Sequence, residues 1–224
     1  MKIFSIRHGE QEYPFNELGG KLVSGVDAPL VDLGKQQMWE LKEELDKERI
    51  TLDAIYRSPL SRAEQSADEL IGGQPIPIYV VDDLKEVFPN SAEGHTYDEL
   101  EERGGGDIYA NPFSPNQESL DHLVERERKA LEFILSDARE KGYTFVGIVG
   151  HGDPLCALDW SLKHADNPTS YGEMRDSYYP QKAQAKEYII NSDLRLEGEG
   201  RIITTEAAEQ TIEGFRNPGS QETK

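Results

Sequence analysis

The segment FVGIV at residues 145–149 is an unbroken apolar run, and it constrains the fold more than any other stretch of the chain. A strand without polar alternation is typical of a parallel sheet that helices cover on both faces. Further strands are expected at residues 2–6, 53–57 and 77–81, and stretches with helical spacing lie between them. This alternation predicts an α/β fold, a three-layer α/β/α sandwich with a mostly parallel central sheet.

The starts of two helices are expected from their capping residues. Ser58 is predicted to cap one helix with Pro59 at its first position, and Asp153 with Pro154 is predicted to begin another in the same way. The remaining elements are expected at residues 34–49, 60–71 and 119–141 for helices and at residues 187–191 and 201–205 for strands.

We expect one domain over residues 1–216, because its length suits a single core and no internal repeat is visible. Two stretches without clear periodicity, near residues 90–117 and 167–184, are expected to be loop insertions. The tail at residues 217–224, rich in small and polar residues, is expected to be disordered.

The charge balance excludes several classes of partner. The chain has 43 Asp and Glu against 24 Lys and Arg, a formal net charge of −19, so nucleic acid and anionic membranes are not expected as partners. It contains no apolar run of the ~18 residues that a membrane-spanning helix needs. The single cysteine, Cys156, excludes an internal disulfide and fits a cytoplasmic location. The sequence indicates no oligomeric state.

Charged and polar side chains follow the predicted strands. Because the carboxyl ends of parallel strands meet at one edge of a sheet, where ligands bind, we expect these side chains to converge. They are Arg7 and His8 after the first strand, Arg57 and Arg62 after the second, Glu86 after the third, and His151 with Gly152 after FVGIV.

These residue types suit phosphoryl transfer without a metal. Guanidinium groups such as those of Arg7 and Arg62 bind phosphate oxygens and stabilise charge during transfer. They also lower the pKa of nearby imidazoles, so that His8 or His151 stays neutral and can attack phosphorus. The carboxyl group of Glu86 can protonate the leaving alcohol and then activate water. No cofactor is predicted, and a metal is not expected because Arg7 would repel a cation beside His8.

Five short motifs carry a family resemblance over residues 2–160. They are Arg7-His8-Gly9-Glu10, Ser58-Pro59-Leu60-Ser61-Arg62-Ala63, Leu84-Lys85-Glu86-Val87-Phe88 with Glu93-Gly94, Glu118-Ser119, and His151-Gly152. In this order and spacing the chain resembles the histidine phosphatase superfamily, also called the phosphoglycerate mutase-like family.

The resemblance implies a metal-independent phosphomonoester hydrolase, acting on a small phosphorylated substrate, that works through a phosphohistidine on His8. It implies that Glu86 is the proton donor and that Arg7, Arg62 and His151 hold the phosphate, with Gly152 beside them. Ser24 is a further candidate for substrate contact. It stands in Ser24-Gly25-Val26, where the family usually has Ser-Gly-Trp.

Alternatives remain open at this stage. A phosphoglycerate mutase is less favoured, because residues 86–89 read EVFP rather than the mutase signature Glu-Arg-x-Tyr-Gly and no Arg-Arg pair follows. A binding protein that keeps the phosphate site without turnover is the non-enzyme alternative. Glu93 could replace Glu86 as the acid, and Arg57 could be a third phosphate ligand. His95, His122 and His164 are expected to be surface or capping residues.

Overall fold

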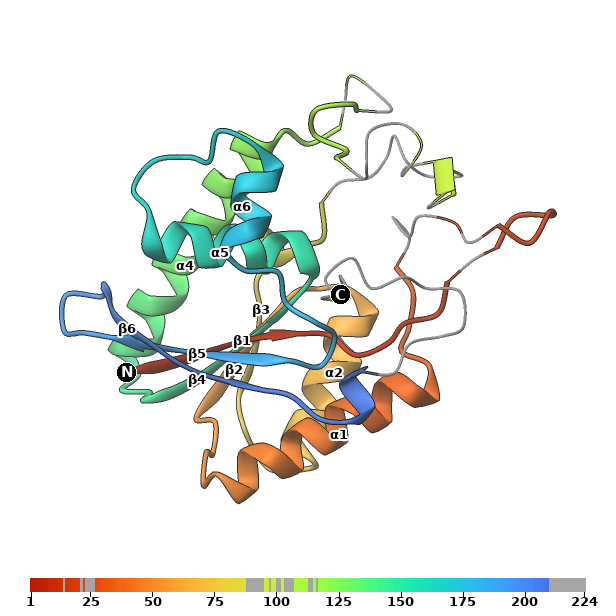
Figure 1. The fold of residues 1–224 in the computed structure, drawn as a ribbon. Helices are drawn as coiled ribbons and strands as arrows, with labels where there is room; N and C mark the ends of the chain where they lie inside the picture. Colours follow the sequence, from red (N-terminus) through yellow and green to blue (C-terminus); the bar gives the residue numbers. More distant parts are fainter. Residues whose placement is uncertain are drawn as a thin grey trace, which may run out of the picture.

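The structure, a computed structural model, describes residues 1–13, 15–20, 22, 27–87, 95–96, 98–99, 102, 107–112, 115 and 117–209. Within this part the chain forms a six-stranded sheet in the order β3-β2-β4-β1-β5-β6 (Figure 1). The strands are β1 (Lys2–Arg7), β2 (Ala54–Arg57), β3 (Ile78–Val80), β4 (Phe145–Gly150), β5 (Ala185–Ile190) and β6 (Leu196–Ile203).

The four strands β1 to β4 are parallel, whereas β5 runs antiparallel to both β1 and β6. The predicted sandwich with a mostly parallel sheet is therefore confirmed. The last strand differs most from the prediction of residues 201–205, because β6 begins at Leu196. Its sequence, LEGEGRII, alternates glutamate with glycine and is largely exposed at the sheet edge, so it has little of the apolar pattern that marks a strand.

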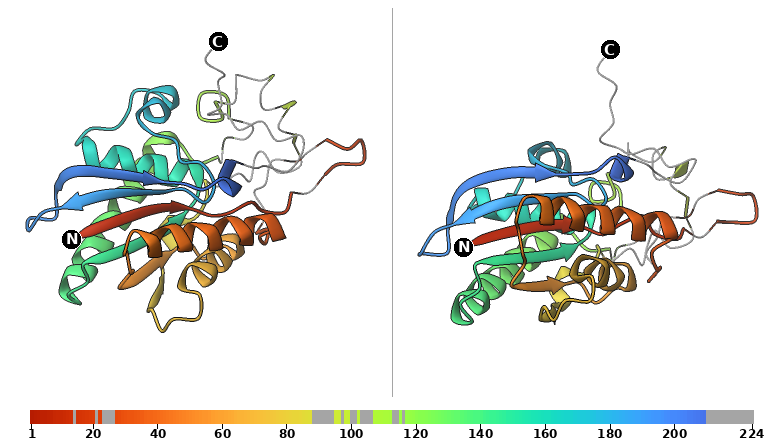
Figure 2. Two further views of the ribbon diagram at one scale, coloured as in Figure 1. Left: turned by 60° about the horizontal axis from the view of Figure 1, so that its bottom comes forward. Right: turned by 90° about the horizontal axis from the view of Figure 1, so that it is seen from below.

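Helices cover both faces of the sheet (Figure 2). Helices α1 (Asp32–Lys47) and α2 (Ser61–Ile71) pack against Phe4 and Ile6 of β1 on one face. Helices α4 (Leu120–Glu140) and α5 (Gly152–Lys163) pack against Ile3 and Val146 on the other. Because successive side chains of a strand point to opposite faces, β1 supplies apolar residues to both layers. A third apolar cluster, around Leu123 and Trp160, joins α4 and α5.

Both predicted helix caps differ in the structure. Helix α2 begins at Ser61, and its first N–H donates to Asp27 Oδ1 at 2.6 Å, so the capping carboxylate comes from a distant segment rather than from Ser58. Helix α5 begins at Gly152 after His151, which places Asp153 inside the first turn. Ser58 and Asp153, the two residues expected to cap these helices, form hydrogen bonds with other polar side chains, as described below.

A short helix lies inside one of the two predicted loop stretches. Helix α6 (Tyr171–Ser177) is capped by Ser170, whose Oγ accepts from the Glu173 N–H at 3.1 Å, and it lies beside α5 (Figure 1). Two short 3-10 turns, η1 (Asp82–Leu84) and η2 (Ala207–Glu209), complete the described elements. The predicted disordered tail at residues 217–224 lies outside the described residues, and the single-domain boundaries remain a prediction.

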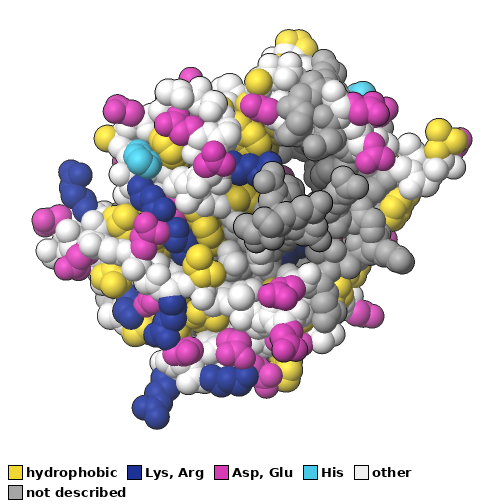
Figure 3. Space-filling model, in the orientation of Figure 1, with side chains coloured by type: hydrophobic (Ala, Val, Ile, Leu, Met, Phe, Trp, Pro, Cys, Tyr) yellow, Lys and Arg dark blue, Asp and Glu magenta, His cyan; other side chains and the backbone are white. Residues whose placement is uncertain are grey.

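None of the helices in the described part of the chain is long and apolar enough to cross a membrane. Acidic side chains are spread around the face of the molecule seen in Figure 3. Several of the charges on α1 pair along the helix, as Lys42 does with Asp46 at 2.6 Å.

The loop after β1 is held by a close approach of two backbones. A side-chain carbon on Gly34, at the start of α1, would lie 2.0 Å from the Glu10 carbonyl oxygen, and one on Gly9 would lie 2.3 Å from the Gly34 carbonyl oxygen. Neither backbone can yield as a flexible side chain would. Glycine at both positions therefore brings α1 directly against the loop that carries His8.

We expect Gly34→Ala to destabilise the protein by about 2 kcal/mol, the range found for overpacking, because the added carbon meets backbone atoms. For a domain of this size the melting temperature should fall by roughly 4–8 °C in a thermal denaturation scan. Gly198→Ala is the matched control, since a side-chain carbon there meets nothing within 4 Å. Equal melting temperatures for the two variants would show that the close approach does not constrain the loop.

Candidate active site

The predicted site residues meet where the parallel strands end. The backbone N–H of His8 donates to the Gly150 carbonyl at 3.1 Å, and that of Ser58 donates to the Val149 carbonyl at 3.0 Å. These bonds continue the sheet for one residue beyond β1 and β2. Arg62 reaches the same place from the first turn of α2. The sheet edge and one helix start thus bring together residues far apart in sequence.

Arg62 lies between two imidazoles and is almost fully buried. Its Nε donates to His8 Nε2 at 3.2 Å and to His151 Nδ1 at 3.1 Å. The ring centroids of the two histidines are 5.1 Å apart. A single guanidinium N–H therefore orients both rings.

These contacts determine the tautomers of the two histidines. His8 Nδ1 lies 2.7 Å from the Gly9 carbonyl, which can only accept, so Nδ1 carries the proton and Nε2 has a free lone pair. His151 Nδ1 accepts from Arg62, so its Nε2 carries the proton and donates to Ser58 Oγ at 2.8 Å. Ser58 Oγ also accepts from the N–H of Leu60, the residue just before α2, at 3.3 Å.

Both imidazoles are held in the neutral form. Burial lowers the pKa of His8 well below its usual value, and the positive charge of Arg62 lowers it further. Burial and the charges of Arg62 and Arg7 lower the pKa of His151 in the same way. Desolvation and nearby like charge both disfavour the imidazolium ion. His8 Nε2 thus keeps its lone pair at neutral pH.

Arg7 enters the site along an aromatic ring. Its guanidinium carbon lies 5.3 Å from the centroid of Tyr179, and its Nη1 donates to the Pro180 carbonyl at 2.9 Å. Within the described residues its buried Nε has no hydrogen-bond partner. A side-chain carbon on Gly152 would lie 2.4 Å from the Tyr179 hydroxyl and 3.2 Å from the Arg7 guanidinium. Glycine at 152 is therefore required for this arrangement.

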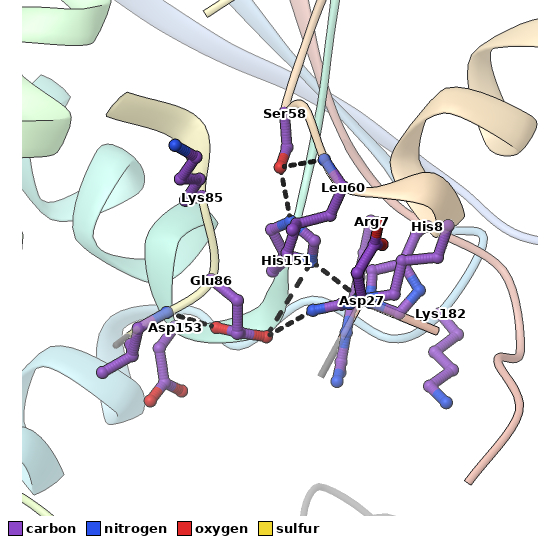
Figure 4. Close-up of polar contacts among 12 residues, drawn as sticks. Arg7, His8, Asp27, Ser58, Leu60, Lys85, Glu86, His151, Asp153 and Lys182 are labelled. Carbon is purple, nitrogen blue, oxygen red and sulfur yellow. Dashed lines mark hydrogen bonds and ion pairs between the residues drawn. The ribbon is translucent and has the colours of Figure 1, made fainter. Parts of the chain in front are cut away.

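Glu86 approaches the pair of imidazoles from the opposite side (Figure 4). Its Oε2 lies 3.9 Å from Arg62 Nη2 and 3.9 Å from His151 Nδ1, while its Oε1 accepts from the Val87 N–H at 3.0 Å. Burial raises the pKa of Glu86, and the nearby carboxyl of Asp153 raises it further, although Arg62 opposes both. A carboxyl group in this setting holds its proton to a higher pH than a solvated glutamate does.

A second carboxyl group, that of Asp153, borders the site among phenol rings. Tyr109 and Tyr171 each donate a hydroxyl hydrogen bond to it, both at 2.9 Å. Arg175 of α6 lies 4.8 Å from the centroid of Tyr179, which itself contacts Arg7. These residues form a polar aromatic wall next to Glu86.

A buried ion pair supports the loop that follows His8. Lys182 Nζ lies 2.7 Å from Glu10 Oε1, and it also donates to the Tyr13 hydroxyl. The Glu10 N–H donates to Gln37 Oε1 of α1 at 2.7 Å. Both charged partners are buried, so each compensates the desolvation of the other.

The structure bears on some of the further site residues that the sequence suggested. Arg57 pairs with Glu64 at 2.6 Å and donates to the Ser58 carbonyl at 3.0 Å, so its described contacts are with the protein surface and backbone. Ser24 and Glu93 lie outside the described residues. No group of three metal-ligating side chains occurs in the part of the chain that the structure describes.

The three other histidines have surface contacts, in line with the prediction. His95 pairs with Glu99 at 3.2 Å, and His122 lies 2.7 Å from Glu118. His164 stacks on Trp160 with ring centroids 4.0 Å apart.

Sequence reasoning missed Ser58 as a partner of His151, the Glu10–Lys182 pair, and Asp153. Ser58 and Asp153 both adjoin recognisable motifs, but the sequence pattern predicts only a helix cap at each and gives no sign of their side-chain partners. Lys182 carried no local signal, because its partner is 172 positions away along the chain.

Residues 3–172 match the family "Histidine phosphatase superfamily (branch 1)". The chain is 29% identical over 195 residues to the uncharacterized phosphatase PhoE of Bacillus subtilis, which covers 84% of this chain and 94% of that protein. It is 28% identical over 173 residues to phosphoserine phosphatase 1 of Hydrogenobacter thermophilus, covering 74% and 78% of the two chains.

The fold matches that of the alpha-ribazole phosphatase from Shigella flexneri, with a TM-score of 0.70 at 21% identity. The match covers 92% of this chain and 96% of that one, and at this identity it establishes the fold. The strand-end motifs, the sheet order and the family match agree with one another. The chain belongs to the histidine phosphatase superfamily, branch 1, and is a phosphatase of that family.

Proposed function

We propose that this protein hydrolyses small phosphate monoesters through a phosphohistidine intermediate on His8. The observation that carries the proposal is the convergence of His8 Nε2, His151 Nδ1 and Glu86 Oε2 on the Arg62 guanidinium, at 3.2, 3.1 and 3.9 Å from its nitrogens. Nucleophile, phosphate ligands and acid lie within one buried cluster, as phosphoryl transfer requires.

In the first step His8 Nε2 attacks phosphorus while the bond to the ester oxygen breaks. Its lone pair is available because the proton sits on Nδ1, and the Gly9 carbonyl keeps it there. As a phosphate enters, the N–H groups of Arg62 and Arg7 turn to its oxygens and neutralise their charge. The first N–H groups of α5, after His151, add the positive end of a helix to this cradle.

The departing alkoxide takes a proton from Glu86. The raised pKa of this carboxyl favours its protonated form, and its Oε2, 3.9 Å from both Arg62 Nη2 and His151 Nδ1, borders the cluster that would bind the phosphate. The resulting carboxylate then removes a proton from water, which attacks the phosphohistidine and releases phosphate. The guanidiniums supply the charge stabilisation, so no metal takes part in either step.

The family relatives support a small monoester as substrate, since one is named for phosphoserine and a fold neighbour for alpha-ribazole. A release assay over phosphoserine, sugar phosphates, nucleotides and phosphoglycerates would rank them. Formation of 2-phosphoglycerate from 3-phosphoglycerate without free phosphate would instead favour the mutase alternative. The single cysteine, Cys156, is buried and unpaired, which supports our proposal of a cytoplasmic location.

We expect His8→Ala to abolish both turnover and covalent labelling, because Nε2 is the attacking atom. Labelled substrate is mixed with enzyme in the presence of a chelator, quenched in base and tested for acid-labile phosphate on the protein. His164→Ala, which changes an exposed histidine stacked on Trp160, is the control and should label as the wild type does. Label on another residue would overturn the assignment, and label that needs an added divalent ion would contradict metal independence.

We expect Glu86→Gln to lower kcat/KM by about 10²- to 10⁴-fold for an alkyl phosphate, the usual contribution of a general acid. The loss should be small for p-nitrophenyl phosphate, whose phenolate leaves without a proton. In the wild type the rate for the alkyl ester should fall on the acid side as His8 becomes protonated and on the alkaline side as Glu86 loses its proton. The alkaline limb should disappear in the variant.

The control for this comparison is Glu64→Gln, which changes a half-exposed carboxylate that pairs with Arg57. It should leave the ratio of the two rates unchanged. An equal loss for both substrates in Glu86→Gln would remove Glu86 from the proton-donor role, and Glu93 would then be compared in the same way.

A further inference from the structure

We infer that Arg126 of α4 is a positioning residue that holds the turn carrying Glu86 and thereby places the general acid. The inference rests on the proposed role of Glu86. Arg126 donates hydrogen bonds to the backbone of this turn and to two glutamates, while its charge also reaches Glu86 and His151. Arg126→Lys, which keeps the charge, separates the positioning role from the effect of that charge.

The contacts of Arg126 with this segment are made to its backbone. Its Nη1 donates to the Lys85 carbonyl at 2.9 Å and to the Asp83 carbonyl. Both carbonyls lie within three residues of Glu86, one in η1 and one immediately before the acid. A backbone held at two points this close cannot shift without breaking a charge-assisted hydrogen bond.

The other side of the guanidinium is fixed to the start of α4. Glu118 accepts from Nε at 2.8 Å and from Nη2 at 2.9 Å in a bidentate pair, and Glu127 Oε1 lies 2.8 Å from Nη1. The side chains of Arg126, Glu118 and Glu127 are 6, 1 and 0% exposed. Burial raises the pKa of Glu127 well above its usual value, so the charge of Arg126 is balanced chiefly by Glu118.

Apolar packing holds the turn on either side of these bonds. Leu84 is fully buried in the core beside α4 and α5, and Val87 is buried against Leu123 and Val124 of α4. The Val87 N–H also holds Glu86 Oε1. The backbone and one carboxyl oxygen of Glu86 are therefore fixed, and Oε2 is left directed at Arg62 and His151 (Figure 4).

Only arginine can make all of these bonds at once. Its planar fork carries five N–H donors, whereas an ammonium group is a single point with three donors on a flexible chain. Loss of the fork would release the carbonyls of the turn and let Glu86 drift from the leaving oxygen. A displacement of about 1 Å can cost ~100-fold in rate, so the effect should be large where the proton matters.

The test compares kcat/KM of Arg126→Met for glycerol phosphate and for p-nitrophenyl phosphate. For each substrate, kcat/KM reports the steps up to phosphoryl transfer to His8. The later hydrolysis does not affect the comparison, because both substrates form the same phosphoenzyme. We expect the ratio of the two values to fall by about tenfold to a hundredfold, with the aryl ester little affected. Fewer folded molecules would lower both rates equally and leave the ratio unchanged, so the ratio isolates the positioning role.

Arg128→Met is the matched control, because Arg128 lies on the same helix and donates to the Asn167 side chain at 3.2 Å rather than to the turn of Glu86. Its ratio should equal that of the wild type. Arg126→Lys keeps the charge but loses the fork, and it should show most of the effect. If the Met variant does not fold, Arg126→Lys and Glu118→Gln, which weakens the bidentate pair, decide the question by the same ratio.

A double variant separates this inference from the proposed function. In a Glu86→Gln background, Arg126→Met should cause no further change in the ratio, since the acid is already lost. If Glu86→Gln leaves the ratio intact, the proposed role of Glu86 fails. If Glu86→Gln lowers the ratio but the Arg126 variants do not, or if the two effects simply multiply, the positioning role of Arg126 is wrong.

Discussion

The arrangement of the site depends on the buried guanidinium of Arg62, whose Nε donates to His8 and to His151 at the same time. A buried cation is costly unless polar partners compensate it, and here two imidazole lone pairs and the carboxyl of Glu86 do so. Burial and the charge of Arg62 keep both rings neutral, and the hydrogen bonds fix their tautomers. Packing of α2 on the sheet, which buries Arg62, thus prepares His8 as a nucleophile.

Around this centre, each reactive side chain is held by a rigid contact that takes no part in the chemistry. The Gly9–Gly34 approach sets the loop of His8, Ser58 holds His151, and Arg126 holds the turn of Glu86. These supports come from different layers of the sandwich, so the site forms only when both helical layers are packed. In this interior the buried cations have buried carboxyl partners, as Lys182 has Glu10 and Arg126 has Glu118.

Much of the fold and the chemistry could be predicted because both depend on local patterns. An apolar run followed by His-Gly, or an Arg-His pair after a strand, identifies a strand end, and parallel strands bring such ends together. What could not be predicted depends on distant partners. Asp27 caps α2 from 34 positions away, and Lys182 meets Glu10 only after the chain has crossed the sheet. Strand β6 was obscured by its exposed Glu-Gly alternation.

The central claim is that His8 carries its proton on Nδ1 and remains neutral at the pH where the enzyme works. Nitrogen-15 NMR of labelled histidine measures both properties directly through the imidazole shifts during a pH titration. The account predicts that His8 carries its proton on Nδ1 and titrates well below 6.5. Because burial also lowers the pKa of His8, Arg62→Met should restore a normal titration only if it also exposes the ring to solvent. A His8 that titrates near 6.5, or that carries its proton on Nε2, would contradict the account.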